Sequence, residues 1–301
     1  MKTLILEGVV HARTQISHNG GELNGNIAMF RRMGVIQPDG TSAEVPYISG
    51  NSVRGKLRDI SAKHTLDMLS EDLNPHKVTL PVFQLLFSGG TLTAGGNKDG
   101  DNSCILFCIK DNLPHVSLFG GAWGNAILQG KMKVNGLIPI AKETAHIIPE
   151  NFLPDDVETL PSVYTYLQLE MFTRRENSKD APFEKYIESS LDVVETSQMI
   201  YHVETIQAGT PFYMKVVLED VTDIEFAAFL SALANFNTMP VVGGKGAVGL
   251  GQIEMHSLEW SEVSKIGNHV NIDRNLTTAN LYERFLKENQ QQVKTVLRDL
   301  G

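Results

Sequence analysis

The chain has little cysteine, no long apolar run and no excess of positive charge. Cys104 and Cys108 are the only cysteines in 301 residues, and such a pair without a nearby histidine is weak support for a metal site or a disulfide framework. The chain contains no run of about 18 apolar residues, the length that spans a membrane. Glu7 comes too early for the apolar region of a secretory signal. We therefore expect a cytoplasmic protein with two buried, reduced thiols on a core strand, and with neither a metal nor a cofactor.

The formal charge of −9 argues at first against a nucleic-acid ligand. The acidic excess is local, however. The segment from Glu150 to Glu225 holds 16 acidic and 5 basic residues, while the rest of the chain holds 19 acidic and 21 basic residues. The composition therefore permits a local basic surface, although the overall positive charge typical of nucleic-acid-binding domains is absent.

Patterns of apolar and turn residues predict an α+β fold rather than a doubly wound sheet. Alternating, β-branched residues predict strands, and apolar residues at helical spacing predict helices. Thr222 and Glu225 form the sequence of a capping box in front of an apolar helix. The expected strands lie at 2–13, 104–110, within 117–140, as a pair within 201–220, and after 250; the expected helices lie at 51–70, 80–87 and 223–237, with a C-terminal helix that turns Leu281, Phe285, Val293, Val296 and Leu300 inward.

The stretch VPYISGNSVRGKLRD, residues 45–59, nearly spells a nucleotide-binding P-loop. Leu57 stands where such a loop needs a serine or threonine hydroxyl for magnesium, which argues against nucleotide hydrolysis. What remains is a Gly–Asn–Ser turn that opens a helix, with Arg54 and Arg58 four residues apart on one face and Lys56 nearby. Because free N–H groups at a helix start attract anions, this turn is a candidate phosphate contact.

A second glycine cluster, GGKGAVGLG at 243–251, contains a literal G-x-G-x-x-G pattern. That pattern binds a dinucleotide when it leads from a strand into a helix. Here the expected helix precedes the cluster and an alternating strand follows it, so a nicotinamide or flavin site is not expected. The glycines instead let a backbone approach an extended anion closely, and Lys245 supplies positive charge.

Together the two clusters resemble the RAMP superfamily of CRISPR-associated RNA-binding proteins. The motifs that carry the resemblance are ISGNSVRGKLR at 48–58 and VVGGKGAVGLGQIE at 241–254. Two further stretches, SLFGGAWGNAILQGKMKV and VETIQAGTPF, are similar to the backbone subunit that polymerises along a CRISPR guide RNA. With ISHNGGELNGNIAMFRRMG and FTRRENSKDA, the chain most resembles the backbone subunit of type IV effector complexes.

The resemblance implies a ferredoxin-like (RRM-like) palm over 1–260, with insertions near 14–47, 71–100 (finger or lid) and 150–200 (thumb), and a helical extension at 261–301. It implies a non-catalytic effector subunit that binds guide RNA (crRNA) without reading its sequence. Its partners would be further copies of itself, head to tail in a filament, other effector subunits, and a DNA or RNA target paired with the guide, with no membrane involved. The residues that it places at the RNA are His18, Asn24, Arg31, Arg32, Ser49, Asn51, Ser52, Arg54, Lys56, Arg58, Arg174, Arg175, Gly243, Gly244, Lys245 and Gly246.

Two other functions stay open on the residues alone. A RAMP endoribonuclease, acting on target RNA or guide precursor, needs a positioned acid, base or metal beside the phosphate. The stretch 19–36 offers only Glu22, Asp39 belongs to a turn, and His18 has no evident partner, so we expect no enzyme activity. In a scaffold without RNA, Arg54 and Arg58 would form an ordinary solvated helix face.

Overall fold

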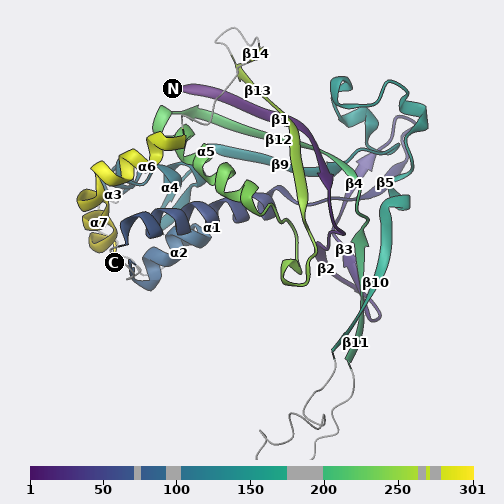
Figure 1. The fold of residues 1–301 in the computed structure, drawn as a ribbon, viewed down its shortest axis with the longest axis horizontal. Helices are drawn as coiled ribbons and strands as arrows, with labels where there is room; N and C mark the ends of the chain where they lie inside the picture. Colours follow the sequence, from purple (N-terminus) through teal and green to yellow (C-terminus); the bar gives the residue numbers. More distant parts are fainter. Residues whose placement is uncertain (71–75, 93–102, 175–198, 264–268, 272–278) are drawn as a thin grey trace, which may run out of the picture.

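The centre of the protein is a five-stranded antiparallel sheet in the order β14-β13-β1-β12-β9. The computed structural model describes residues 1–70, 76–92, 103–174, 199–263, 269–271 and 279–301 (Figure 1). The strands of this sheet are β1 (Lys2–Ala12), β9 (Met132–Pro139), β12 (Pro211–Val221), β13 (Ile253–Val263) and β14 (His269–Asn271).

Two helices, α1 (Gly50–Leu69) and α5 (Asp223–Thr238), cover one face of this sheet. Along the chain the central elements follow one another as β1-α1-β9-β12-α5-β13. A β-α-β-β-α-β order with this antiparallel sheet is the ferredoxin-like arrangement. The predicted α+β class with a ferredoxin-like palm is therefore confirmed.

The main core lies between the sheet and these two helices. Alternate β1 residues, among them Leu4 and Leu6, face the helices, where Leu57 of α1 and Phe229 of α5 meet them. The ring of Trp260 on β13 packs edge-on against Phe229, with 5.9 Å between the ring centroids. Period-two apolar residues on the strands thus meet helical apolar stripes, as the sequence pattern predicted.

A helical lobe flanks the palm and contains both the first insertion after α1 and the C-terminal extension (Figure 1, left). A buried polar cluster joins the two parts: the Tyr282 hydroxyl lies 2.8 Å from Thr65 Oγ1 and 3.2 Å from His115 Nδ1. The elements of this lobe are α2 (Leu80–Ser88), α3 (Ser103–Asn112), α4 (Pro114–Phe119), α6 (Ala279–Glu288) and α7 (Gln290–Asp299), with a small sheet of β6 (Gly90–Leu92), β7 (Gly121–Gly124) and β8 (Ala126–Leu128).

The single helix expected at the C-terminus is in fact the pair α6 and α7, separated at Asn289. Its expected inward side is confirmed, because Val293 and Val296 are buried and Leu281, Phe285 and Leu300 pack against buried clusters.

The expected core strand at 104–110 is wrong. These residues belong to helix α3, and Cys104 and Cys108 are exposed free thiols rather than buried ones. A short apolar run fits a strand or a helix equally well, and tertiary packing decides between them. Here Ile105 and Ile109, four residues apart, pack into the cluster that also holds Val293 of α7.

A second sheet, in the order β10-β11-β3-β2, lies at the other end of the palm. Its strands β10 and β11 extend away from the palm as an arm (Figure 1, lower right). The two strands expected within 201–220 are present as β11 and β12, but they pair in different sheets rather than with each other. The strands here are β2 (Asn19–Asn24), β3 (Ile27–Phe30), β10 (Leu167–Arg174) and β11 (Met199–Ile206), next to the hairpin of β4 (Arg32–Ile36) and β5 (Ser42–Pro46).

Within the residues that the structure describes, none of the helices is long and apolar enough to cross a membrane.

Candidate nucleic-acid interface

The two glycine clusters meet through a short segment at Ser17 and His18. The backbone N–H of Gly244 donates to the Ser17 carbonyl at 2.6 Å, and the backbone N–H of Ser49 donates to His18 Nε2 at 3.2 Å. Ser17 therefore binds the second glycine cluster (243–251), called the late loop below. His18 binds the Gly–Asn–Ser turn at the start of α1, called the first turn below. The two clusters therefore contact adjacent residues of one short segment.

The glycines allow close contact between chain segments. A Cβ on Gly243, which has a φ of +72°, would lie 2.3 Å from the Ser17 carbonyl oxygen, and a Cβ on Gly50 would lie 2.1 Å from the Val134 carbonyl oxygen. Real Cβ atoms do not approach an oxygen that closely, so only glycine fits at either position. These glycines hold the two loops against β9 and the Ser17–His18 segment.

Ser49 and His18 are already engaged with each other at the start of α1. The Ser49 side chain caps the helix by accepting from the Ser52 N–H, and its hydroxyl lies 3.2 Å from His18 Nε2. Burial, and then the nearby charge of Arg31, lowers the pKa of His18 below its ordinary value. His18 is therefore a neutral hydrogen-bond acceptor near pH 7. Asn51, two residues after Ser49, is exposed.

Arg54 and Arg58 point into the protein. The guanidinium of Arg54 donates to the Phe119 carbonyl, and that of Arg58 donates to the Phe119 and Gly120 carbonyls at 2.7 and 2.9 Å. Burial lowers the pKa of both groups, that of Arg58 to about 10. These two side chains bind the carbonyl groups that end α4, and on this helix only the neighbouring Lys56 is an exposed cation of the predicted set.

Arg31 and Arg32 have different surroundings. Arg32 forms a two-pronged ion pair with Glu204 of β11 at 2.7 and 2.8 Å, with 18% of its side chain exposed. Arg31 is exposed, its Nε donates to the Tyr47 hydroxyl at 3.4 Å, and its backbone pairs with His18 and Tyr47. Arg31 thus adds charge beside the His18–Ser49 contact, whereas Arg32 fixes the second sheet.

The remaining predicted residues lie further out or are not described. Asn24 is exposed at the β2–β3 turn. Arg174 is the last residue of β10 and only its backbone is described, while Arg175 lies outside the described residues.

Lys245 contacts two aromatic rings at the base of the arm. Its Nζ lies 4.5 Å from the ring centroids of both Phe172 and Tyr201 and donates to the Tyr201 hydroxyl at 3.1 Å. The two rings come from paired positions on β10 and β11 and stack with 5.5 Å between centroids. The late loop is therefore held against the arm by cation–π contacts.

Sequence reasoning missed this aromatic pair. Phe172 and Tyr201 lie within stretches that the sequence had singled out, but nothing in the order of residues shows that the two rings face each other. Only the register of β10 against β11 brings them together.

Comparisons with known proteins support the fold. No family model and no curated protein matches the chain. A solved structure titled "Type IV-B CRISPR Complex" contains a chain that is 21% identical, with a TM-score of 0.55, covering 92% of this chain and 97% of that chain. The two chains share a fold.

The face of the palm sheet that α1 and α5 leave uncovered differs from an RRM surface that stacks bases. Glu7 of β1 lies opposite Glu259 of β13 and forms an ion pair with Lys215 at 3.2 Å. Tyr213 on this face packs against the Phe152 ring, with 5.4 Å between the ring centroids. Its hydroxyl donates to Glu7 at 2.7 Å, and burial with this hydrogen bond raises the Tyr213 pKa. RRM domains place exposed aromatic rings here, so the glycine-loop end is the better anion surface.

Asp39, which the sequence analysis weighed as the acid of an endoribonuclease, forms part of a turn. Its carboxylate accepts from the Thr41 N–H at 2.9 Å and the Thr41 hydroxyl at 2.6 Å. These hydrogen bonds lower its pKa. Both contacts are those of a turn-forming aspartate.

Proposed function

We propose that this chain is a non-catalytic backbone subunit of a CRISPR effector complex, which binds guide RNA independently of sequence and stacks with further copies along it. The observation that carries the proposal is the meeting of both glycine loops at Ser17–His18, beside the arm, in a fold shared with a chain of the type IV-B complex structure. The subunit role and the RNA ligand come from that shared fold together with the motif resemblance.

The proposed contact surface, called the guide surface below, consists of Arg31, Tyr47, Asn51, Gly244 and Lys245. Hydrogen bonds connect its parts in sequence: Tyr47 to Arg31, Arg31 to His18, and His18 to the turn that precedes Asn51. Arg31 and Asn51 are exposed along this path. A surface that contacts the phosphates of a strand, with few groups that could contact base edges, binds nucleic acid without reading its sequence.

Charge on the guide surface comes from Arg31 and Lys245. Gly244 donates its N–H to Ser17 within the protein, so the loop itself is not offered as an amide cradle. Lys245 gives one of its three ammonium donors to Tyr201, and an ammonium group has donors left for a phosphate oxygen. Arg54 and Arg58 are left out of this surface because they bind carbonyl groups of the protein.

The proposal is tested first by copurification. The protein is purified alone and with a guide RNA, and the ratio of absorbance at 260 and 280 nm is measured together with the mass by light scattering. We expect a large, nuclease-sensitive particle in the presence of guide. A clean monomer that ignores RNA would contradict the proposal and the guide surface together.

A charge-neutral variant then tests the surface itself. Arg31→Gln with Lys245→Gln should weaken RNA binding and lower the slope of log K against log salt by about 0.7 for each lost phosphate contact. The matched control is Arg284→Gln with Lys287→Gln, which removes the same charges from exposed positions on α6. Equal salt slopes for the two variants would contradict the assignment.

The non-catalytic part of the proposal has its own test. The turn contacts of Asp39 with Thr41 support a structural role. Purified particles are incubated with target RNA that matches the guide, and we expect the RNA to stay intact. Cleavage that disappears in Asp39→Asn would replace this proposal with the endoribonuclease.

A further inference from the structure

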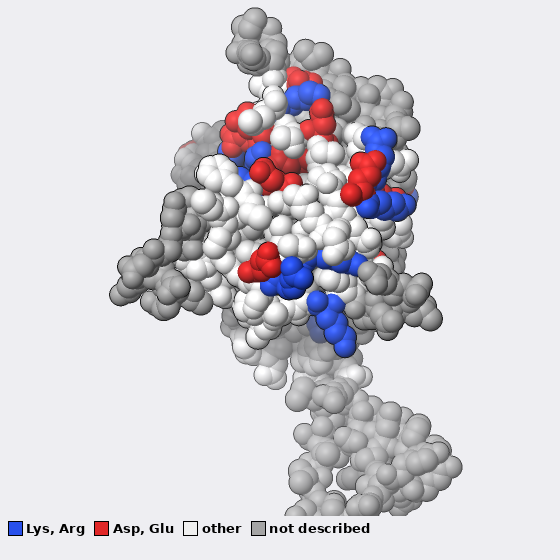
Figure 2. All heavy atoms as spheres, turned by 90° about the vertical axis from the view of Figure 1, so that its left-hand side faces the viewer, with Lys and Arg blue, Asp and Glu red and all other residues white. Residues whose placement is uncertain are grey.

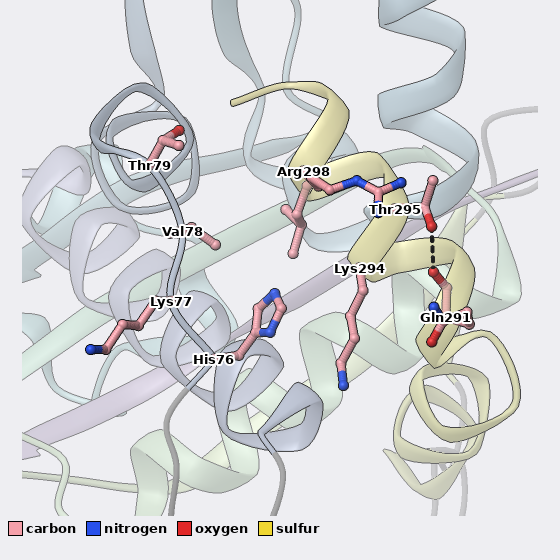
Figure 3. A pocket seen from close by; sticks show the side chains of 9 residues that line it. His76, Lys77, Val78, Thr79, Gln291, Lys294, Thr295 and Arg298 are labelled. Carbon is pink, nitrogen blue, oxygen red and sulfur yellow. Dashed lines mark hydrogen bonds between the residues drawn. The ribbon is translucent and has the colours of Figure 1, made fainter.

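A pocket of about 380 Å³ lies on the helical lobe, between the segment that precedes α2 and the helix α7 (Figure 3). The first side of the pocket is formed by residues 76–79 and the second by α7 from Gln291 to Arg298. Figure 1 places this corner beside the C-terminus, at the opposite end of the molecule from the arm. The pocket, called the α7 pocket below, is therefore separate from the guide surface.

The lining of the α7 pocket is basic. Lys77, Lys294 and Arg298 contribute three cations, and His76 adds an imidazole, while no carboxylate is among the described lining residues. Figure 3 shows the side chains of His76 and Lys294 extending into the space between the two segments, with Arg298 running along α7 and Lys77 pointing away from α7. Figure 2, which faces this side of the lobe, shows a small group of lysine and arginine side chains below the centre, with acidic side chains directly beside it.

Asp299 neutralises the charge of Arg298 only weakly. Asp299 lies 3.5 Å from Arg298 Nε, but the two side chains are 67% and 75% exposed. Exposed pairs of this kind contribute little and are screened by salt. His76 and Lys294 also have interactions of their own within the chain, so an anion would join an existing network.

The neutral groups of the pocket add hydrogen-bonding partners beside the cations. Thr79, Thr295 and Gln291 place hydroxyl and amide groups among the cations, and the Thr295 hydroxyl donates to the Gln291 carbonyl at 2.9 Å along the helix. No phenylalanine, tyrosine or tryptophan is among the described residues that line the pocket. The volume lies within the range of about 300–1,000 Å³ that is usual for small-ligand sites.

We propose that the α7 pocket binds a phosphate group, through Lys294 and Arg298 of α7. The phosphate comes either from a strand of nucleic acid that crosses the helical lobe or from a small phosphorylated ligand, and the recognition chemistry is the same. The strand as source rests on the proposed function, whereas phosphate binding itself does not.

The test follows backbone amide resonances of the whole chain by NMR during two titrations, one with inorganic phosphate and one with a six-nucleotide oligothymidylate. We expect the amides of residues 76–79 and 291–298 to shift in both. Lys294→Gln with Arg298→Gln should weaken each titration at least about tenfold, because a hydrogen bond to a charged group is worth roughly that factor. Arg284→Gln with Lys287→Gln, on exposed positions of the neighbouring α6, should change the dissociation constant in either titration less than about twofold.

A further variant guards against misfolding. Lys294→Gln alone removes a single charge of the lining and should weaken phosphate binding while leaving the amide spectrum elsewhere unchanged. Shifts with phosphate but not with the oligonucleotide would support the pocket and assign it to a small ligand. Absence of shifts at both pocket segments, or equal losses in the pocket variant and the α6 control, would overturn the proposal. Either result leaves the guide-surface test with Arg31 and Lys245 untouched.

Discussion

The backbone N–H of Ser49 donates to His18 Nε2 at 3.2 Å, which joins the start of α1 to the segment that holds the late glycine loop. The bond requires the neutral imidazole, since a protonated ring has no acceptor. His18 is thus a positioning residue whose protonation state matters for the site geometry.

Acid should destabilise the fold through histidines that are half-buried or fully buried. Burial lowers the pKa of His18, His64 and His115, that of His115 to about 3. Since the unfolded chain then binds more protons than the folded chain below the ordinary histidine value of 6.5, the free energy of unfolding falls as pH drops through that value. Urea titrations at pH 7.5 and pH 5 measure the difference.

The control for this prediction is a pair of variants. His115→Asn cannot be protonated and should shrink the change between the two pH values, whereas His11→Asn, at an exposed position, should leave it as in the unmodified protein. An unchanged pH response in His115→Asn would contradict the argument.

Removing Arg58 should lower stability. Arg58→Met removes the side-chain donor of the Gly120 carbonyl and leaves the Phe119 carbonyl with Arg54 alone, and each hydrogen bond to a charged group is worth about 1.5–3 kcal/mol. Lys56→Met on the same helix, exposed to solvent, should change the free energy of unfolding by less than about 0.5 kcal/mol. Chemical denaturation measures both, and equal effects would show that Arg58 has no special role in the interior.

Two glycine-to-alanine variants should have opposite signs. Gly243→Ala forces a Cβ against the Ser17 carbonyl at a positive φ, so we expect a loss of more than about 1 kcal/mol. Gly55→Ala, inside α1 with nothing within 4 Å of the added Cβ, should gain about 0.5–1 kcal/mol from helix propensity. Thermal unfolding of the two variants checks the prediction, and a stable Gly243→Ala would mean that the two loops separate readily.

Assembly along the guide should depend on the arm. Leu169, Met171 and Ile200 lie on one face of the β10–β11 pair and are 58%, 61% and 50% exposed. In the proposed filament they pack against the next copy, so Met171→Glu should reduce the particle mass on a long guide RNA while a single copy still binds RNA. Ile147→Glu, which alters another exposed apolar residue, is the control, and a full-sized particle with Met171→Glu would exclude the arm from the interface.

Local rules predicted the palm well. The capping box forms as expected, with Thr222 accepting from the Glu225 N–H and Glu225 accepting from the Thr222 N–H, because both partners lie within one helical turn. The run that contains Cys104 and Cys108 was assigned to the wrong element because its length fits either one, and α7, which decides the matter, is distant in sequence.

The site was harder to predict than the fold. A helix-face arginine that binds a carbonyl looks the same in sequence as one that binds a phosphate, so Arg54 and Arg58 could not be told apart from RNA contacts. The contact of Lys245 with Phe172 and Tyr201 depends on the register of two strands and on a loop from a third region. Neither the arginine–carbonyl contacts nor the contact of Lys245 with the two rings can be predicted from the spacing of residues in the sequence.

The pairing of Ser17 with Gly244 joins residues from near the two ends of the palm sequence. A ribosome delivers the first of these residues long before the second, and contacts of such large sequence separation form late in folding. A growing chain therefore carries the Gly–Asn–Ser turn without its partner loop for most of its synthesis. Under the proposed function, a partly made chain would lack the complete guide surface until translation has passed the last helix of the palm.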